Sequence, residues 1–184
     1  MAACLPLGLC VKLTITMQKL LSREQLDLTI QRLAYQLLED DADCNDVVYI
    51  GLQPRGIYIS NAITDVVKSI SNKEINYGKL DITFYRDDFK NEFHSANQTD
   101  IPFSVENKKV VLIDDVLYTG RTIRAALDAL LDFGRPQSVK LCVLVNRRFN
   151  REFPIQPDFC GITVDSIMSQ KVKVEPLTGE VFLS

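Results

Sequence analysis

Apolar residues along this chain follow two alternating patterns. Between Ser22 and Glu39 they recur every three or four positions, which predicts an amphipathic helix with Ser22 as its N-cap. Predicted helices cover residues 22–39, 56–70 and 121–134, and predicted strands cover residues 47–52, 78–88, 108–114 and 139–145. Apolar strands that alternate with helices are typical of parallel sheets. We therefore predict an α/β fold: a single domain with a central, mainly parallel sheet flanked by helices.

The N-terminal end and one internal stretch lack these patterns. Residues 1–16 are small and mostly apolar, and no basic region precedes the apolar stretch as it would in a signal peptide. We interpret residues 1–16 as an N-terminal extension outside the fold, with targeting as the alternative, and residues 17–184 as the folded domain. Residues 90–104 are polar and predict a loop.

The composition is that of an ordinary globular protein. Hydrophobic residues make up 46% of the chain and charged residues 24%, and the net charge of −3 gives no overall basic field that would favour nucleic acid. No run of 18 apolar residues predicts a membrane span. The five cysteines form no CxxC pair and the chain has a single histidine, so we predict no zinc site. We interpret the cysteines as reduced thiols of a cytoplasmic protein, with Cys142 in the core.

The stretch VVLIDDVLYTGRTIRAAL, Val110–Leu127, carries the clearest chemistry. An apolar run ends in Asp114 and Asp115, and Tyr118–Thr122 then lead into a helical pattern. In a parallel sheet, ligands bind beyond the carboxyl ends of the strands, and a helix N-terminus there favours an anion. Two carboxylates beside an anion need other partners, and sugar hydroxyls and Mg²⁺ are suitable. The pattern therefore indicates a phosphorylated ribose, whereas the acidic pair taken alone is also compatible with a capping or turn pair.

These residues resemble the ribose-5-phosphate signature of type I phosphoribosyltransferases. The other common phosphate loops, GxxxxGK[ST] and GxGxxG, are absent from the sequence. Further segments resemble the bifunctional proteins that attenuate pyrimidine operons and act as uracil phosphoribosyltransferases. These segments are GLQPRG, KLDITFYRDDF, the block from TDIPF to GRP, and VLVNRRFNREFPIQPDF. The resemblance covers about residues 17–174.

The resemblance implies a binding site for phosphoribosyl pyrophosphate. Asp114 and Asp115 are expected to hold the ribose hydroxyls and, directly or indirectly, Mg²⁺, and together with Arg55 they are the expected catalytic residues. The 5-phosphate is expected at Tyr118, Thr119, Gly120, Arg121 and Thr122, and the pyrophosphate at Gln53, Pro54, Arg55 and Gly56. Val116 and Leu117 are expected to bind the substrate as well. Arg86 is expected at the edge of a flexible loop over the pyrophosphate, or else in an ion pair with Asp87 or Asp88.

The implied reaction transfers the phosphoribosyl group to uracil and yields UMP and pyrophosphate, in a homodimer or larger homo-oligomer. Its transition state should resemble an oxocarbenium ion, so positioning and charge stabilisation would supply the catalysis. Residues 89–99 are the expected lid that excludes water. We interpret His94 in that stretch as a solvent-facing loop residue, with a catalytic acid as the alternative.

The same family binds the messenger RNA of pyrimidine genes, and here the chain departs from the pattern. Gln31, Tyr35, Gln156 and Ile162 stand where the family has Thr, His, Arg and Lys. The cations left for RNA are Arg32, Arg147, Arg148 and Arg151. Because phosphate contacts supply most nonspecific affinity, we expect weak RNA binding without a nucleotide. Two alternatives stay open: an RNA-binding attenuator that senses UMP and UTP with little enzymatic role, and a phosphoribosyltransferase for another base.

Overall fold

The computed structural model of the chain describes residues 17–41, 46–86 and 98–184. The helices are α1 (Arg23–Asp40), α2 (Gly56–Ser71) and α3 (Arg121–Leu130), with 3-10 turns η1 (Thr83–Tyr85) and η2 (Leu131–Phe133). The strands are β1 (Gln18–Leu21), β2 (Val47–Gln53), β3 (Asn76–Asp81), β4 (Lys109–Leu117), β5 (Ser138–Arg148), β6 (Phe159–Asp165), β7 (Val172–Glu175) and β8 (Glu180–Leu183). The predicted extension, residues 1–16, and most of the predicted lid, including His94, lie outside the described residues.

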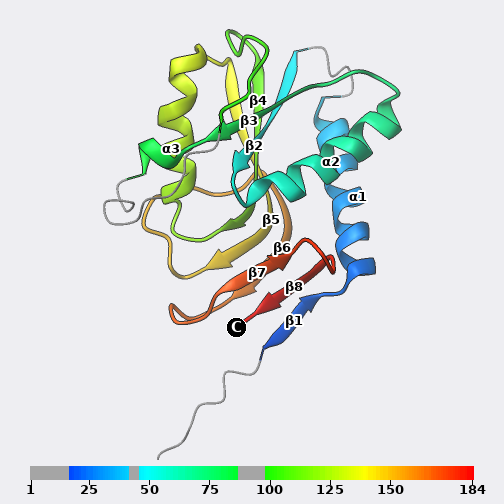
Figure 1. The fold of residues 1–184 in the computed structure, drawn as a ribbon, viewed down its shortest axis with the longest axis vertical. Coiled ribbons are helices and arrows are strands. Elements are labelled where there is room, and N and C mark those ends of the chain that lie inside the picture. The colour runs from blue at the N-terminus through cyan, green and yellow to red at the C-terminus, as the bar shows by residue number, and fades with distance from the viewer. Residues whose placement is uncertain (1–16, 42–45, 87–97) are drawn as a thin grey trace, which may run out of the picture.

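A five-stranded parallel sheet forms the centre of the molecule, in the order β3-β2-β4-β5-β6 (Figure 1). This confirms the predicted α/β architecture. β4 is the middle strand, so the loops that follow β2 and β5 lie on either side of the loop that follows β4. The strand order therefore brings together the ends of the segments that the sequence marks as functional.

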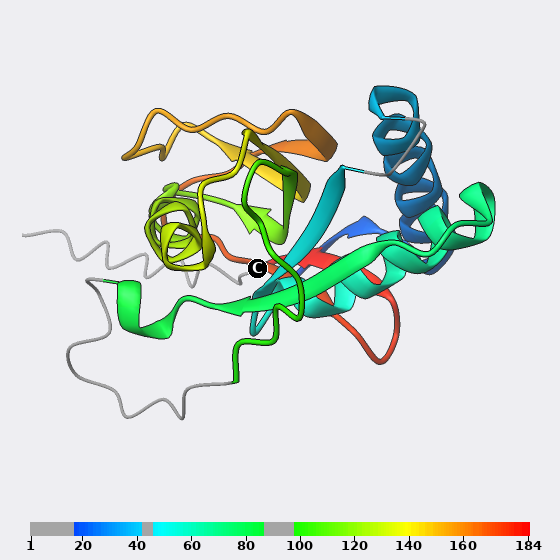
Figure 2. The same cartoon turned by 90° about the horizontal axis from the view of Figure 1, so that it is seen from above.

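Helices cover both faces of this sheet (Figure 2). α1 and α2 pack on one face, where Leu33 and Ile63 belong to the same buried cluster as Ile113. α3 packs on the other face, where Ile123 belongs to a second cluster with Leu112. Both faces of the central strands are buried, which explains why their sequences are continuous apolar runs without alternation. Cys142 is fully buried in the core, as predicted.

α1 begins where the sequence predicts. The Ser22 hydroxyl accepts a hydrogen bond from the Gln25 N–H at 3.3 Å, and the Gln25 side chain accepts one from the Ser22 N–H at 2.9 Å. This reciprocal capping box satisfies two N–H groups that a helix start otherwise leaves without an acceptor. The predicted apolar positions of α1 are buried, except Leu38, which is half-buried at the edge of the core.

A second, three-stranded antiparallel sheet, β1-β8-β7, was not predicted. Its strands have four residues each, too few to give a periodic signal, and lysine or glutamate interrupts them. Gly179, in the turn between β7 and β8, lies beside Arg23 and Tyr58 and so close to the starts of α1 and α2. β6 was also missed, since Gly161 and Thr163 break its apolar pattern.

The predicted bounds were wrong at several ends. The strand predicted over 78–88 ends at Asp81, because the Asp81 carboxylate accepts hydrogen bonds from both the N–H and the hydroxyl of Thr83, which turns the chain into η1. The last helix leaves the α conformation after Leu130 and ends as η2. β4 and β5 each continue three residues beyond their predicted ends. No helix within the described ranges is long and apolar enough to cross a membrane.

Candidate active site

Asp114 and Asp115 lie within the last part of β4, at the carboxyl edge of the sheet. β2 pairs with β4 only as far as Gly51 and Ile113, whereas β5 continues to pair with β4 up to Leu117. The two carboxylates therefore lie where the chain turns away from β2, and this opens the sheet edge on that side.

The two carboxylates are held by backbone groups of the same strand. Asp114 Oδ1 accepts the Asp115 N–H at 2.9 Å, and Asp115 Oδ1 accepts the Val116 N–H at 2.8 Å. Burial and the neighbouring Asp115 carboxylate raise the pKa of Asp114 well above its usual value. Burial also raises the pKa of Asp115, against the lowering effects of its hydrogen bonds and of the Arg55 charge. Two acids that resist ionisation in this way gain most from a partner that donates hydrogen bonds or carries positive charge.

Gly56, the first residue of α2 after the β2–α2 loop of Pro54 and Arg55, packs directly against this pair. A Cβ atom on Gly56 would lie 2.9 Å from the Ile113 carbonyl oxygen and 3.0 Å from Asp114 Oδ1, so only glycine allows this approach. Arg55 is exposed and caps α2, and its guanidinium has no ion-pair partner among the described residues. The start of α2, with its free N–H groups and a cation, thus adjoins the carboxylates.

The loop between β4 and α3, Tyr118–Gly120, forms the other side of the site. Gly120 caps α3 with a φ of 91°, in the left-handed region that favours glycine. The Arg121 N–H lies 3.4 Å from the Thr119 hydroxyl, and the Arg86 guanidinium donates a hydrogen bond to the Thr122 hydroxyl at 3.0 Å. The predicted threonines and glycine therefore surround a helix N-terminus, with Arg86 beside them.

A segment after β5 lies across the β4–α3 loop. The N–H groups of Glu152 and Phe153 donate to the Thr119 carbonyl at 2.9 and 3.1 Å. The Glu152 carboxylate pairs with Arg121 at 2.6 Å, so this predicted phosphate ligand has an acidic partner. Glu152 and Phe153 were not singled out from the sequence, where the arginines around them drew attention to charge and nothing indicated a contact with Thr119.

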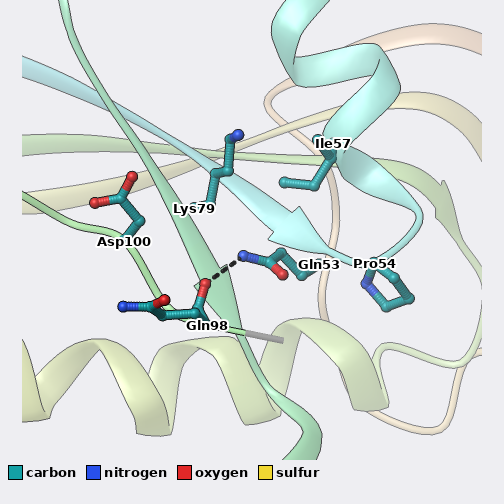
Figure 3. Close-up of a pocket in the computed structure, with 6 residues that line it drawn as sticks. All are labelled: Gln53, Pro54, Ile57, Lys79, Gln98 and Asp100. Carbon is teal, nitrogen blue, oxygen red and sulfur yellow. Dashed lines mark hydrogen bonds between the residues drawn. The ribbon is translucent and has the colours of Figure 1, made fainter. Parts of the chain in front are cut away.

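A cavity of about 630 Å³ lies on the β3 side of the β2–α2 loop (Figure 3). Its described walls are Gln53, Pro54, Ile57, Lys79, Gln98 and Asp100. The Gln53 side chain points into it and donates a hydrogen bond to the Gln98 carbonyl at 2.9 Å (Figure 3). Two of the predicted pyrophosphate residues thus face this cavity, whereas none of its described walls comes from β4 or the β4–α3 loop. Lys79 was not predicted as a site residue, since its position in a strand pattern gives no sign of a functional role.

Asp114 and Asp115 fit a Mg²⁺ ion that is bound jointly by the protein and the substrate, and not one held by the protein alone. Within the described part of the chain no group of three or more acidic, histidine or cysteine side chains gathers to hold a metal. Asp114 and Asp115 nevertheless offer two adjacent carboxylates whose charge is poorly compensated. Mg²⁺ in nucleotide enzymes is commonly bound by one or two carboxylates plus substrate phosphates.

The four predicted RNA-binding arginines have different surroundings. Arg32 is exposed on α1 and donates to the Cys160 carbonyl at 3.2 Å, which places α1 beside β6. Arg148 is exposed and pairs with both carboxylate oxygens of Asp165, at 2.5 and 2.7 Å. Arg147 is only 4% exposed, and Arg151 is half-buried beneath the β4–α3 loop.

Comparison with known proteins gives one consistent result. Residues 17–177 match the family described as phosphoribosyl transferase domain. Bifunctional protein PyrR of Picosynechococcus sp. is 43% identical over 163 residues, which cover 88% of this chain and 92% of that protein. Bifunctional protein PyrR of Elusimicrobium minutum is 42% identical over 169 residues, which cover 89% and 94%. Among solved structures, the hypoxanthine phosphoribosyltransferase of Trypanosoma cruzi has the same fold, with a TM-score of 0.71 at 15% identity over 90% of this chain and 95% of that one.

Proposed function

Since this chain belongs to the PyrR family of phosphoribosyltransferases, we propose that it transfers the phosphoribosyl group of phosphoribosyl pyrophosphate to uracil. The products are UMP and pyrophosphate. This is the function that the sequence predicts, and the strength of the family match, which spans nearly the whole described chain, supports it.

The arrangement of charges at the sheet edge carries the proposal. Two helix N-termini, those of α2 and α3, flank the Asp114–Asp115 pair. Helix N-termini favour phosphates, and carboxylates accept hydrogen bonds from vicinal hydroxyls. A substrate that fits this order has an anionic group at each end and a diol between them. Phosphoribosyl pyrophosphate has this constitution, with a 5-phosphate, two ribose hydroxyls and a 1-pyrophosphate.

The residues have separate tasks in the reaction. N1 of uracil forms a bond to C1 of the ribose, the bond from C1 to the pyrophosphate oxygen breaks, and the N1 proton is lost. The β4–α3 loop and Asp114 and Asp115 hold the sugar phosphate so that C1 is positioned for attack. Arg55 stabilises the charge that develops on the departing pyrophosphate. Mg²⁺, held through Asp114 and Asp115 together with the substrate, supplies further positive charge when bound.

A transfer assay across bases tests this function. Purified protein is incubated with phosphoribosyl pyrophosphate, Mg²⁺ and one of uracil, hypoxanthine, guanine or orotate, and the nucleotide formed is measured. We expect UMP as the main product. Preferential turnover of hypoxanthine, guanine or orotate would assign the chain to another base, and no turnover of any base would remove the enzymatic proposal.

A regulatory role through RNA is the second function that we propose, because the two segments expected to bind RNA adjoin each other. The Arg32 side chain on α1 reaches the backbone of Cys160 and Gly161 on β6, so that α1 and β6 form one surface. Cations on this surface are few, since Arg148 is paired with Asp165. We expect weak, salt-sensitive binding to the leader of the cell's own pyrimidine genes, strengthened by UMP. A mobility-shift titration with and without UMP measures it, and nanomolar specific binding at physiological salt without nucleotide would contradict it.

A further inference from the structure

Arg147, near the end of β5, has an unusual environment for an arginine in a basic run of the sequence. Its guanidinium lies 3.8 Å from the centre of the Tyr118 ring. Its Nε donates to the Ser166 hydroxyl at 2.7 Å, and its Nη2 donates to the Ile167 carbonyl at 3.1 Å. The residue is only 4% exposed, and no described carboxylate lies within ion-pair distance. Because a buried cation with only neutral partners is costly, the arrangement calls for a function that offsets it.

Arg151 contacts the backbone of the same loop. Its Nη1 donates to the Tyr118 carbonyl, and its Nη2 donates to Asn146 Oδ1 at 2.6 Å. Burial lowers the pKa of both Arg147 and Arg151, which agrees with their position inside the molecule. The residues that follow, Glu152 and Phe153, hold the next carbonyl of the loop, that of Thr119.

The β4–α3 loop is fixed largely by residues that lie outside it. Its last residue, Gly120, has a left-handed φ of 91°, and β4 ends just before the loop. Arg147, near the end of β5, holds the Tyr118 ring, and the segment after β5 holds the carbonyls of Tyr118 and Thr119. Residues outside the loop therefore set its conformation, and this conformation orients the free N–H groups at the start of α3.

We propose that Arg147 and Arg151 are positioning residues that hold the β4–α3 loop in the shape that binds the 5-phosphate. The inference rests on the proposed function for the identity of the ligand. Arg147 also joins the loop to Ser166 and Ile167, which precede β7, so the phosphate site and the small sheet are connected through one side chain. A dianionic phosphate in the site would in addition interact favourably with this otherwise uncompensated charge.

Arg148 provides a matched control. It follows Arg147 directly, carries the same charge and belongs to the same basic run, but it is exposed and pairs with Asp165. If the basic run serves RNA as a charged surface, the loss of either arginine should weaken RNA binding alike. If Arg147 holds the loop, only its loss should change the phosphate site.

The experiment compares Arg147→Met with Arg148→Met in the full chain. The first readout is amide hydrogen exchange of residues 117–122 without ligand, and the second is calorimetric affinity for phosphoribosyl pyrophosphate with Mg²⁺. Compared with the unsubstituted protein, we expect Arg147→Met to exchange faster in this loop and unchanged in the central strands. We also expect it to bind phosphoribosyl pyrophosphate at least about tenfold more weakly, which is ~1.4 kcal/mol. Arg147→Lys should recover part of the affinity, and Arg148→Met should match the unsubstituted protein in both readouts.

A milder variant keeps the inference testable if Arg147→Met does not fold. Ser166→Ala removes one acceptor of Arg147 without touching the loop, and Ser169→Ala, at an exposed position, is its control. We expect Ser166→Ala alone to speed exchange in residues 117–122 and to raise the KM for phosphoribosyl pyrophosphate about threefold, with the KM for uracil unchanged.

Two results would overturn the inference. One is identical loop exchange in the Arg147→Met, Arg148→Met and unsubstituted proteins. The other is faster exchange spread evenly over the domain, which would indicate a general loss of stability. If the unsubstituted protein fails to bind phosphoribosyl pyrophosphate, the proposed function fails, and the exchange measurement still decides whether the arginines hold the loop.

Discussion

The buried acid at the centre of the site should make the protein less stable than it could be. Asp114 is 5% exposed, and burial and the Asp115 carboxylate raise its pKa well above the usual value. The Asn side chain has nearly the same shape, and its oxygen can accept the same hydrogen bond from the Asp115 N–H. We therefore expect Asp114→Asn to be more stable than the unsubstituted protein at pH 8 and to lose transfer activity.

The sign of the pH dependence follows from the direction of the pKa shift. An unfolded Asp titrates near ~3.9, whereas folded Asp114 keeps its proton to a higher pH. Across that window the folded state binds more protons than the unfolded state, so stability falls as pH rises and the loss is complete above the folded pKa. Asp114→Asn has no carboxyl group at this position, so it does not lose stability in this way as the pH rises. At pH 8 the free energy of unfolding of Asp114→Asn should exceed that of the unsubstituted protein by at least ~1 kcal/mol, the lower end of the cost of a poorly compensated buried polar group. This corresponds to ~2–4 °C in Tm for a domain of this size.

Urea unfolding without ligand, at pH 8 and again near pH 4.5, measures this gain. Asp65→Asn is the control, because Asp65 is exposed on α2 and the same charge is lost there without burial. The gain for Asp114→Asn should shrink towards pH 4.5, since folded Asp114 then holds its proton and pH 4.5 lies only just above the pKa of an unfolded Asp, where the loss begins. A stability equal to or below that of the unsubstituted protein at pH 8, or a gain independent of pH, would refute the reasoning.

Three further predictions concern the same domain. Asp115→Asn should lower kcat/KM for phosphoribosyl pyrophosphate at least about tenfold, because the ribose and metal lose a charged acceptor; this is ~1.4 kcal/mol, and unchanged kinetics at limiting substrate would remove the assignment. Gly120→Ala should lower Tm by ~2–8 °C, because a left-handed non-glycine residue costs ~1–2 kcal/mol; a thermal scan decides it. Deletion of residues 1–16 should leave Tm and transfer unchanged, since the family match begins at residue 17, and a fall of several degrees would show that they pack on the domain.

The central part of the fold could be predicted because its signals are local. β2, β4 and β5 are runs of consecutive apolar residues, and α1 is a capped helix with periodic apolar residues, so each can be recognised from a short stretch of sequence. The carboxylate pair and the loop after it could be named for the same reason, since strand, acids, glycine and threonines follow one another directly.

The parts that escaped prediction depend on contacts between distant segments. β1 is a strand only because β8 pairs with it, and its four residues carry no period of their own. The contact of Arg147 with Tyr118 is equally invisible in the sequence, where adjacent arginines look alike. The end of β3 is a different case, because a single Asp–Thr turn interrupted an alternation that otherwise continued.

The pairing of β1 with β8 has a consequence for how the chain matures on the ribosome. Lys19 of β1 and Glu180 of β8 form an ion pair although 161 residues separate them. At a synthesis rate of ~5–20 residues per second, β1 leaves the ribosome roughly 8–32 s before its partner. β8 is the middle strand of its sheet, so β1 and β7 are both without a neighbour until then. β1 therefore remains without its β8 partner during that whole interval, and the small sheet can form only when synthesis is nearly complete.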